Sequence, residues 1–262
     1  MNPSKMYSLS VCADTVFLGL PFVERVKTIA KKGFAVEFWN WKGRDIEAIA
    51  ADPEIRINGF TGYLRGSIVH PDGAEEFLAG VRESLAIAAQ LRCRTLFISS
   101  GELDGRGQVA HTIAQHPATK WITAYKTLCR VAELAEKHDV VYTLEHLNTK
   151  VDHPGFPFAR VDEALNLLIE VGSPRIKLLL DVYHAQIEEG NLIELIRKCR
   201  AHIGHVHIAD VPGRHEPGTG EINYPRIAEV FREIGYNGFV GLEAFPLSSD
   251  DAALDRFREV FS

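Results

Sequence analysis

IGHVHIADVPGRHEPGTGEINY, residues 203–224, runs from a short apolar segment into a loop rich in glycine, proline and charge. The segment carries His205 and His207 at alternate positions, which share one face of an extended strand. Asp210 follows where the apolar residues end. Two interpretations are open: the histidines are hydrogen-bonded core residues, or at least one is a metal ligand or proton donor at a strand end. What the rest of the chain brings to the same place decides between them.

Other short apolar runs of this kind alternate with amphipathic segments along the chain. The runs are YSLSVC (7–12), AVEFW (35–39), INGFTGYL (57–64), RTLFIS (94–99), VVYTLE (140–145), IKLLLD (176–181) and FVGLE (239–243). Helical patterns lie between them, for example over 21–32, 75–91 and 123–138. Strands that alternate with helices predict a parallel sheet with right-handed crossovers. Eight such units in 262 residues predict one α/β domain over residues 1–262, a (β/α)8 TIM barrel.

A doubly wound open sheet is the structural alternative, and it is weaker because no G-x-G-x-x-G motif follows the first strand. Polar residues mark several helix starts. Asn191, Asn223 and Ser249 each precede an amphipathic segment and are predicted to cap its N-terminus. The second helix, within 43–51, is predicted to be short.

Composition argues against several classes of function. The chain has 29 Lys and Arg against 35 Asp and Glu, a net charge of −6, whereas a nucleic-acid partner requires a basic surface. Its four cysteines are widely separated, so we expect free thiols in a reducing compartment. The first residues match a signal peptide poorly, and no apolar run is long enough to cross a membrane. We expect a cytoplasmic protein with a small-molecule substrate and no membrane partner; homo-oligomerisation stays open.

The last four predicted strands each end in an ionisable residue. Strand five ends in Glu145, strand six in Asp181, strand seven in His207 and strand eight in Glu243. Because active sites of such barrels lie at the C-terminal ends of the strands, we expect these side chains to meet at one rim. A single acid at a strand end can merely cap the next helix. Four consecutive strands that do this indicate a site.

Carboxylates that converge in this way repel one another unless a cation neutralises them. Three carboxylates and one imidazole form a hard, oxygen-rich ligand set that favours Mn2+ or Mg2+, with Co2+ and Zn2+ as further candidates. The sequence therefore predicts one divalent metal ion, with no nicotinamide or flavin. His207, nearer the strand end, is the predicted histidine ligand. His205, one layer deeper, is predicted to be a core or supporting residue.

Four segments resemble the hydroxypyruvate isomerase family, which belongs to the xylose-isomerase-like TIM barrels together with ketose 3-epimerases and endonuclease IV. They are LEHLN (144–148), LLDVYHAQ (179–186), the stretch 203–224 and GFVGLEAF (238–245). The resemblance runs through nearly the whole chain, and the DVYH and R-x-E-P-G-T-G-E-I-N-Y blocks are specific. It implies a divalent metal on Glu145, Asp181, His207 and Glu243. It further implies that Glu145 and Glu243 are the acid–base pair and that His184 and Arg214 contact the substrate.

The resemblance also implies a reaction, the isomerisation of hydroxypyruvate to tartronate semialdehyde by proton transfer through an enediolate. One departure bears on the substrate: hydroxypyruvate isomerases commonly carry Gln where this chain has His207, and ketose 3-epimerases carry His. Ketose 3-epimerisation is therefore the alternative. A metal-dependent abasic-site endonuclease on the same fold is a third candidate, disfavoured because such an enzyme needs a basic surface.

Other residues near the predicted rim have two interpretations each. Arg214 either forks to a substrate carboxylate or makes a surface ion pair, and His184 either faces the cavity or bonds to backbone. The PGTGE turn that follows Arg214, at residues 217–221, is interpreted as a loop scaffold, since it lacks the lysine of a phosphate-binding loop.

Aromatic residues near the ends of strands two and three, Trp39, Trp41 and Phe60, either line the pocket or belong to the core. Glu37, near the end of strand two, and Lys177, at the start of strand six, receive no assigned role.

Overall fold

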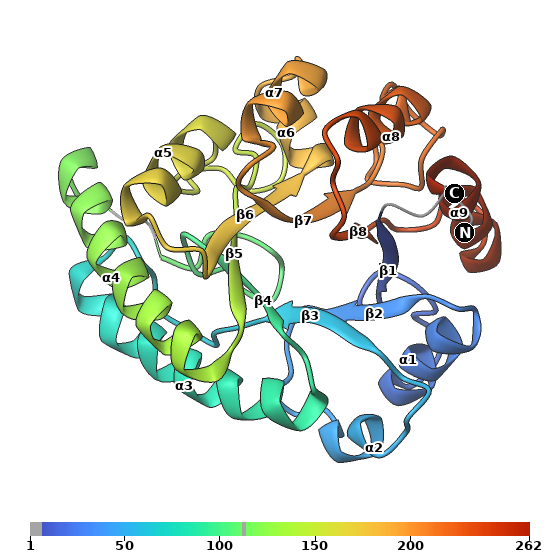
Figure 1. The fold of residues 1–262 in the computed structure, drawn as a ribbon, viewed down its shortest axis with the longest axis horizontal. Coiled ribbons are helices and arrows are strands. Elements are labelled where there is room, and N and C mark those ends of the chain that lie inside the picture. The colour runs from blue at the N-terminus through green and yellow to red at the C-terminus, as the bar shows by residue number, and fades with distance from the viewer. Residues whose placement is uncertain (1–6, 112–113) are drawn as a thin grey trace.

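The computed structural model describes residues 7–111 and 114–262, so the first six residues, which bear on the signal-peptide prediction, lie outside it. Within the described residues, eight parallel strands close into a barrel in chain order, with β8 pairing to β1 (Figure 1). The strands are β1 Ser8–Cys12, β2 Ala35–Phe38, β3 Ile57–Thr61, β4 Thr95–Ser99, β5 Val141–Glu145, β6 Ile176–Asp181, β7 Ile203–Ile208 and β8 Phe239–Leu242. The predicted (β/α)8 TIM barrel is confirmed, and the open sheet is wrong.

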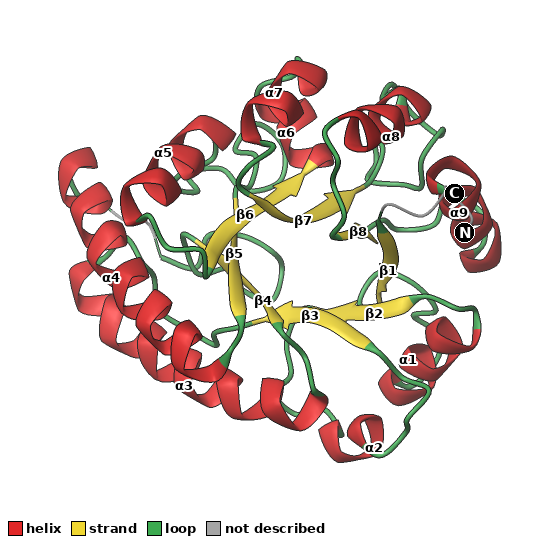
Figure 2. Ribbon diagram, viewed as in Figure 1, coloured by secondary structure: helices red, strands yellow, loops and turns green. Residues whose placement is uncertain are grey.

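Helices surround the closed sheet on its outside (Figure 2). They are α1 Phe22–Lys31, α2 Ile46–Ala50, α3 Ala74–Leu91, α4 Pro117–His138, α5 Val161–Val171, α6 Val182–Glu188, α7 Leu192–Cys199, α8 Tyr224–Glu233 and α9 Asp250–Phe261, with a short 3-10 helix at Pro71–Gly73. The α4 helix begins ahead of its periodic segment, because Pro117 suits a first turn and the His116 ring accepts a hydrogen bond from the Ala118 amide.

Two of the three predicted caps are confirmed. The side chain of Asn223 accepts from the Arg226 amide, and that of Ser249 accepts from the Ala252 amide. The prediction for Asn191 is wrong. This residue adopts a left-handed backbone conformation, with φ 49°, and its side chain makes no cap hydrogen bond. Asparagine tolerates that conformation better than most residues, so its role here is to turn the chain.

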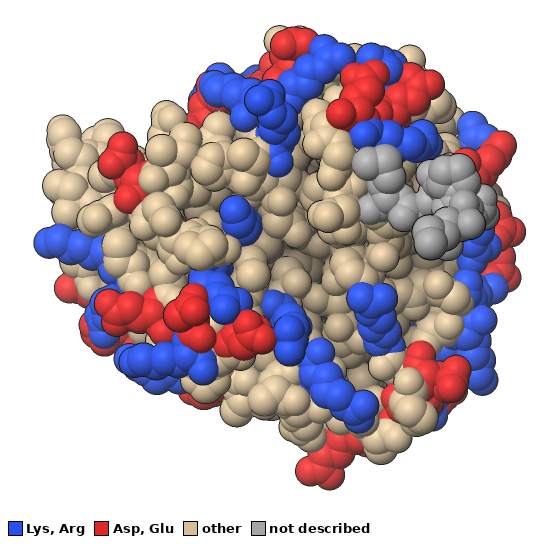
Figure 3. Space-filling model, viewed as in Figure 1, with Lys and Arg blue, Asp and Glu red and all other residues tan. Residues whose placement is uncertain are grey.

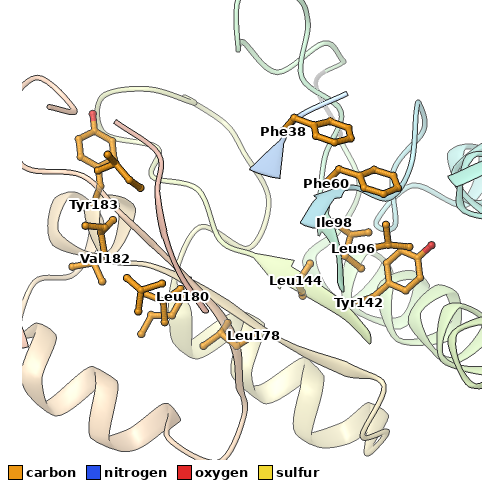
Figure 4. Packing of buried hydrophobic residues seen from close by; sticks show 14 of the residues in the cluster. Phe38, Phe60, Leu96, Ile98, Tyr142, Leu144, Leu178, Leu180, Val182 and Tyr183 are labelled. Carbon is orange, nitrogen blue, oxygen red and sulfur yellow. The ribbon is translucent and has the colours of Figure 1, made fainter. Parts of the chain in front are cut away.

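Strand side chains that face outward form the main apolar core with the helices. Figure 4 shows Leu144, Leu178 and Leu180 within this layer, and Phe38 beside Phe60. The last two rings are stacked with centroids 5.2 Å apart. Burying each of these side chains contributes about 1.5–3 kcal/mol, so this layer holds the barrel closed and fixes the position of the strand ends.

Side chains that face the inside of the barrel are unusually polar. Ser10, Glu37, Thr143 and His205 are all buried there. Gly241, in register with His207 on the neighbouring strand, makes room for them: a Cβ at this position would lie 2.5 Å from Glu37 Oε2. The barrel interior therefore carries a hydrogen-bonding network below the rim on which the candidate site lies.

On the face shown in Figure 3, acidic and basic side chains are interspersed toward the edge, and several Lys and Arg side chains lie around an uncharged central hollow. None of the helices in the described parts of the chain has the length and apolar character needed to cross a membrane. All four cysteines are free, as predicted; Cys12, Cys93 and Cys199 are buried and Cys129 is half-buried.

Candidate active site

The four predicted ligand residues meet at the C-terminal rim of the barrel. Ligand atoms of Glu145, Asp181, His207 and Glu243 all lie within 4.8 Å of one another. His207 Nδ1 lies 3.3 Å from Glu145 Oε1 and 3.6 Å from Glu243 Oε2. Asp181, His207 and Glu243 are almost fully buried, whereas Glu145 is partly exposed to the cavity. The apolar residues preceding each group fix its strand, and the register between strands brings the groups together.

Electrostatics at this cluster shows the cost of gathering carboxylates. Burial, with the charges of Glu145 and Glu243, raises the pKa of Asp181 to about 7 despite Arg214 nearby. Burial would also raise the pKa of Glu243, but the charges of His207 and Arg214 outweigh it and lower that pKa. For His207, burial is outweighed by Glu243 and by hydrogen bonds to neighbouring carboxylates, so its pKa is well above the usual range. The positive charges of His207 and Arg214 therefore govern the ionisation of the whole cluster.

His184 lies one helical turn after Asp181, as the spacing predicted. Its backbone amide donates to Asp181 Oδ1 at 3.0 Å, and its Nδ1 lies 2.7 Å from Asn148 Nδ2. The ring is fully buried yet borders the cavity, and its Nε2 lies 3.7 Å from Asp181 Oδ2 with no hydrogen-bond partner among the described residues. Burial, followed by the charge of Arg214, lowers the pKa of His184 well below its usual value. His184 Nδ1 also accepts from the backbone amide of Asn148 at 3.3 Å, so the ring both bonds to backbone and borders the cavity, where it suits a substrate contact.

Arg214 reaches the same place from the loop after β7. Its Nη2 contacts Glu243 Oε2 and lies 3.9 Å from Asp181 Oδ2, and its guanidinium lies 5.2 Å from the centroid of the Tyr183 ring. The backbone at Arg214 is left-handed, with φ 57°, which is uncommon for a residue other than glycine. The surface-pair interpretation of Arg214 is therefore wrong, because the side chain is turned inward onto the acidic cluster.

The loop that carries Arg214 is anchored by two buried carboxylates, Asp210 near its start and Glu216 in its middle. Asp210 accepts hydrogen bonds from the backbone amides of Val211, Gly218 and Ile222, at 2.9, 2.8 and 3.0 Å. Glu216 accepts from the Leu247 amide at 2.9 Å. The scaffold interpretation of this loop is confirmed. Asp210 also follows a strand end in the sequence. Its carboxylate binds the loop backbone and does not face the cluster.

A cavity of about 790 Å³ opens over the cluster, within the range of about 300–1,000 Å³ typical of small-molecule sites. Trp39 lines it and donates from Nε1 to Glu243 Oε1, as one interpretation of that residue had it. Trp41 and Phe60 do not line it: the Trp41 indole donates to Ser84 Oγ, and Phe60 is fully buried in the core. The far part of the cavity is formed by loop residues that no sequence motif marked, including residues 102–108 and Asp152.

Glu37 lies directly beneath the cluster. Its Oε2 accepts from His207 Nε2 at 2.9 Å, and its Oε1 accepts from Asn58 Nδ2 at 2.8 Å and from the Ser10 hydroxyl. His205 Nε2 lies 2.9 Å from Oε1 but is not aligned as a donor. Burial would raise the pKa of Glu37, but both histidines hold it well below its usual range. His205 is buried below the rim, in agreement with its predicted supporting place.

Lys177 lies away from this cluster. Its Nζ is 3.5 Å from the carbonyl oxygen of Ala201, near the start of β7, and it does not line the cavity. The structure therefore assigns Lys177 no role in the site.

The rim residues fit a single divalent ion. Three carboxylates and one imidazole supply oxygen and nitrogen atoms close enough to share one ion, given ligand distances of about 2.0–2.2 Å. The raised pKa of Asp181 marks negative charge that a cation would stabilise. Three carboxylates around one imidazole form the hard ligand set expected from the sequence.

A family model for the xylose isomerase-like TIM barrel matches residues 14–260. The chain belongs to this family. The hydroxypyruvate isomerase of Escherichia coli K12 is 34% identical to this chain over 260 residues, covering 95% of this chain and 97% of the relative. A 2-oxo-tetronate isomerase of Cupriavidus necator is 31% identical over 248 residues, covering 89% and 90%.

This chain is also similar to a solved structure described as AP endonuclease, family 2, from Brucella melitensis. It is 30% identical, superposes with a TM-score of 0.86, and covers 97% of this chain and 98% of that one. The resemblance expected from the motifs is confirmed at the level of the family and of its isomerase-named relatives.

Proposed function

We propose that this chain is a divalent-metal-dependent isomerase of short 2-oxo acids, with hydroxypyruvate and tartronate semialdehyde as its substrate pair. The observation that carries the proposal is the convergence of Glu145 and Glu243, from opposite parts of the rim, on one cluster beside the guanidinium of Arg214. The isomerase names of the relatives support the same reaction class.

The reaction requires a proton to leave one carbon beside a carbonyl and return to its neighbour. One carboxylate of the pair takes the proton and the other group returns it, on either side of an enediolate. Glu243 suits a base because His207 and Arg214 favour its ionised form, and the Trp39 indole orients it by hydrogen bonding. A bound divalent ion would supply electrophilic stabilisation of the negative charge that develops on the substrate oxygens.

Arg214 and His184 would hold the substrate. The Arg214 fork matches a carboxylate, which distinguishes a 2-oxo acid from a free ketose. His184, whose ring borders the cavity, would contact a substrate oxygen. The acidic net charge is a poor match to a nucleic-acid backbone.

A second candidate is a 2-oxo acid one carbon longer, undergoing the same proton transfer. The size of the cavity favours it, because 790 Å³ exceeds what a three-carbon acid occupies, and polar residues such as Gln108 and Asp152 line the far part. A relative named 2-oxo-tetronate isomerase supports this candidate. Both candidates use the same residues in the same roles.

A substrate panel in deuterated water tests the proposal. Hydroxypyruvate, 2-oxo-tetronate and free ketoses would be incubated with the protein and with Mg2+ or Mn2+ supplied separately. We expect a 2-oxo acid to turn over and its product to carry solvent deuterium. Turnover of ketoses alone would favour the 3-epimerase, cleavage of abasic DNA would favour the endonuclease, and a product free of deuterium would indicate a hydride shift.

The ligand assignment has its own test. Metal analysis of Asp181→Asn and His207→Ala should reveal lost occupancy, whereas the exposed variant Glu133→Gln should retain it. Full metal retention in both ligand variants would contradict the assignment.

A further inference from the structure

Glu37 is a fully buried carboxylate with no contact to the cavity, yet several donors converge on it. It reaches from β2 across the barrel to His207 on β7, 170 residues away along the chain. A buried charge is costly unless it is paired and hydrogen-bonded, and this one has His207, Asn58 and Ser10 as partners. So costly an arrangement at the underside of the rim cluster requires an explanation beyond packing.

We propose that Glu37 is a positioning residue that fixes the tautomer and ring orientation of His207, and that Gly241 provides the space for it. This inference rests on the proposed metal site. His207 has two ring nitrogens that face different neighbours: Nε2 lies 2.9 Å from Glu37 Oε2, and Nδ1 lies 3.3 Å from Glu145 Oε1. With a proton held on Nε2 by Glu37, Nδ1 is the nitrogen left to bind an ion among the rim carboxylates.

Hydrogen bonds from a ligating histidine to a carboxylate commonly orient the ring and raise its basicity. Two neighbouring rings also constrain His207: Phe97 and His205 both lie nearly perpendicular to it, with centroids 5.2 Å and 4.9 Å away. These contacts set the plane of the ring but do not choose which nitrogen carries the proton. The neighbouring carboxylates of Glu37 and Glu145 can both only accept, and Glu37 holds the proton on Nε2 because its contact is the shorter one, 2.9 Å against 3.3 Å.

An ion held among Glu37, His205 and His207 is the competing explanation, since these three could also share a metal. The hydrogen bonds argue against it. Both oxygens of Glu37 already accept from Ser10, Asn58 and His207, and the group is buried away from the cavity, with Glu37 1% exposed. The rim cluster, in contrast, borders the cavity through Glu145 and Glu243.

Two variants disturb Glu37 in different ways. Glu37→Gln keeps the size of the side chain and removes its charge. Gly241→Ala keeps the charge but adds a Cβ that would lie 2.5 Å from Glu37 Oε2, so the carboxylate must move off His207. Thr143→Val is the matched control, because Thr143 is equally buried and its hydroxyl has no hydrogen-bond partner among the described residues.

The first readout is the affinity for Mn2+, measured by direct titration of the folded proteins. We expect Glu37→Gln and Gly241→Ala to weaken Mn2+ binding about 10- to 100-fold, the usual effect of losing such a partner, and Thr143→Val to bind as the parent does. Equal affinity in all four proteins would overturn the proposal. So would Mn2+ binding that survives Asp181→Asn but is abolished by Glu37→Gln, because the ion would then lie in the deeper cluster.

The second readout is the protonation of His207 itself, from 15N spectra of histidine-labelled protein at an alkaline pH, where the ring is neutral. We expect the proton on Nε2 in the parent and in Thr143→Val, and a mixture of tautomers in Glu37→Gln. An unchanged tautomer in Glu37→Gln would overturn the positioning role. If the parent binds no Mn2+, the metal in the proposed function is wrong, and the tautomer still decides the role of Glu37.

Discussion

The two halves of the barrel contribute differently to the site. Strands β5–β8 end at, or within one residue of, the four members of the charged cluster, Glu145, Asp181, His207 and Glu243. Strands β1–β4 end in Cys12, Phe38, Thr61 and Ser99, none of which is charged. The first half instead supplies groups that hold the charged ones: Glu37 hydrogen-bonds His207, and Trp39 hydrogen-bonds Glu243. The residues proposed to react therefore come from the β5–β8 half of the barrel, and the residues that orient them come from the β1–β4 half.

The largest expected effect comes from the charged half. Glu145→Gln and Glu243→Gln should each lower kcat for the best 2-oxo acid about 10²–10⁴-fold, because each removes one partner of the proton transfer. Steady-state kinetics with exposed Glu133→Gln as a control measures this. One variant is expected to retain exchange of the substrate proton with solvent, which identifies the carboxylate that acts first. Near-parent turnover in both variants would contradict the mechanism.

Arg214→Lys should have the next largest effect. Lysine keeps the charge but loses the planar fork, so one charge-assisted hydrogen bond of about 1.5–3 kcal/mol is lost and kcat/KM for 2-oxo acids falls about 10- to 150-fold. The loss should appear mainly in KM. Arg226→Lys, on exposed ion pairs of α8, is the control. An equal loss for free ketoses would mean that Arg214 does not recognise the substrate carboxylate.

A smaller effect is expected from the supporting half. Trp39→Phe removes the indole donor to Glu243, worth about 0.5–1.5 kcal/mol, so kcat should fall about 2- to 10-fold. The indole is 40% exposed, so stability should barely change. Kinetics and thermal unfolding of the same preparation separate the two effects. A fall as large as that of Glu243→Gln would place Trp39 among the reacting groups and end the division between the halves.

The smallest effects concern the fold alone and should be equal in both halves. Asp45 caps α2 in the first half and Ser249 caps α9 in the second, each accepting from a backbone amide. Replacing either by Ala should lower the free energy of unfolding by about 1 kcal/mol and leave Mn2+ affinity unchanged. Chemical denaturation measures the stability of both variants, and Mn2+ titration measures their metal affinity. A change in metal affinity in either variant would mean that helix ends and the rim are coupled.

Much of the fold could be predicted because each strand and helix carries its own periodicity. The run at 176–181 matches β6 residue for residue, whereas the run at 57–64 overshoots β3, which ends at Thr61. Strand ends depend on how neighbouring strands pair, which a single segment does not encode. Asn191 is likewise a plausible cap by residue type. Its left-handed backbone places it in a turn, and its side chain does not cap the helix.

The rim cluster was predictable for a physical reason as well. In a parallel barrel the position of a residue in its strand decides its height, so acids at the ends of successive strands must meet. The place of Glu37 was not predictable. Its side chain is long enough to reach His207 across the barrel, but the reach depends on the closure of the sheet and on Gly241 facing it.

By itself, the sequence determined the strand order, the barrel and the residues at the C-terminal rim, because hydrophobic periodicity and strand-end position are local properties. Only the tertiary structure decided that Arg214 turns inward and that Asp210 anchors its loop. It also decided that Trp39 lines the cavity, whereas Trp41 and Phe60 do not. These outcomes depend on which distant backbone groups and side chains satisfy one another once the barrel closes. Such pairings have no signature in any single segment.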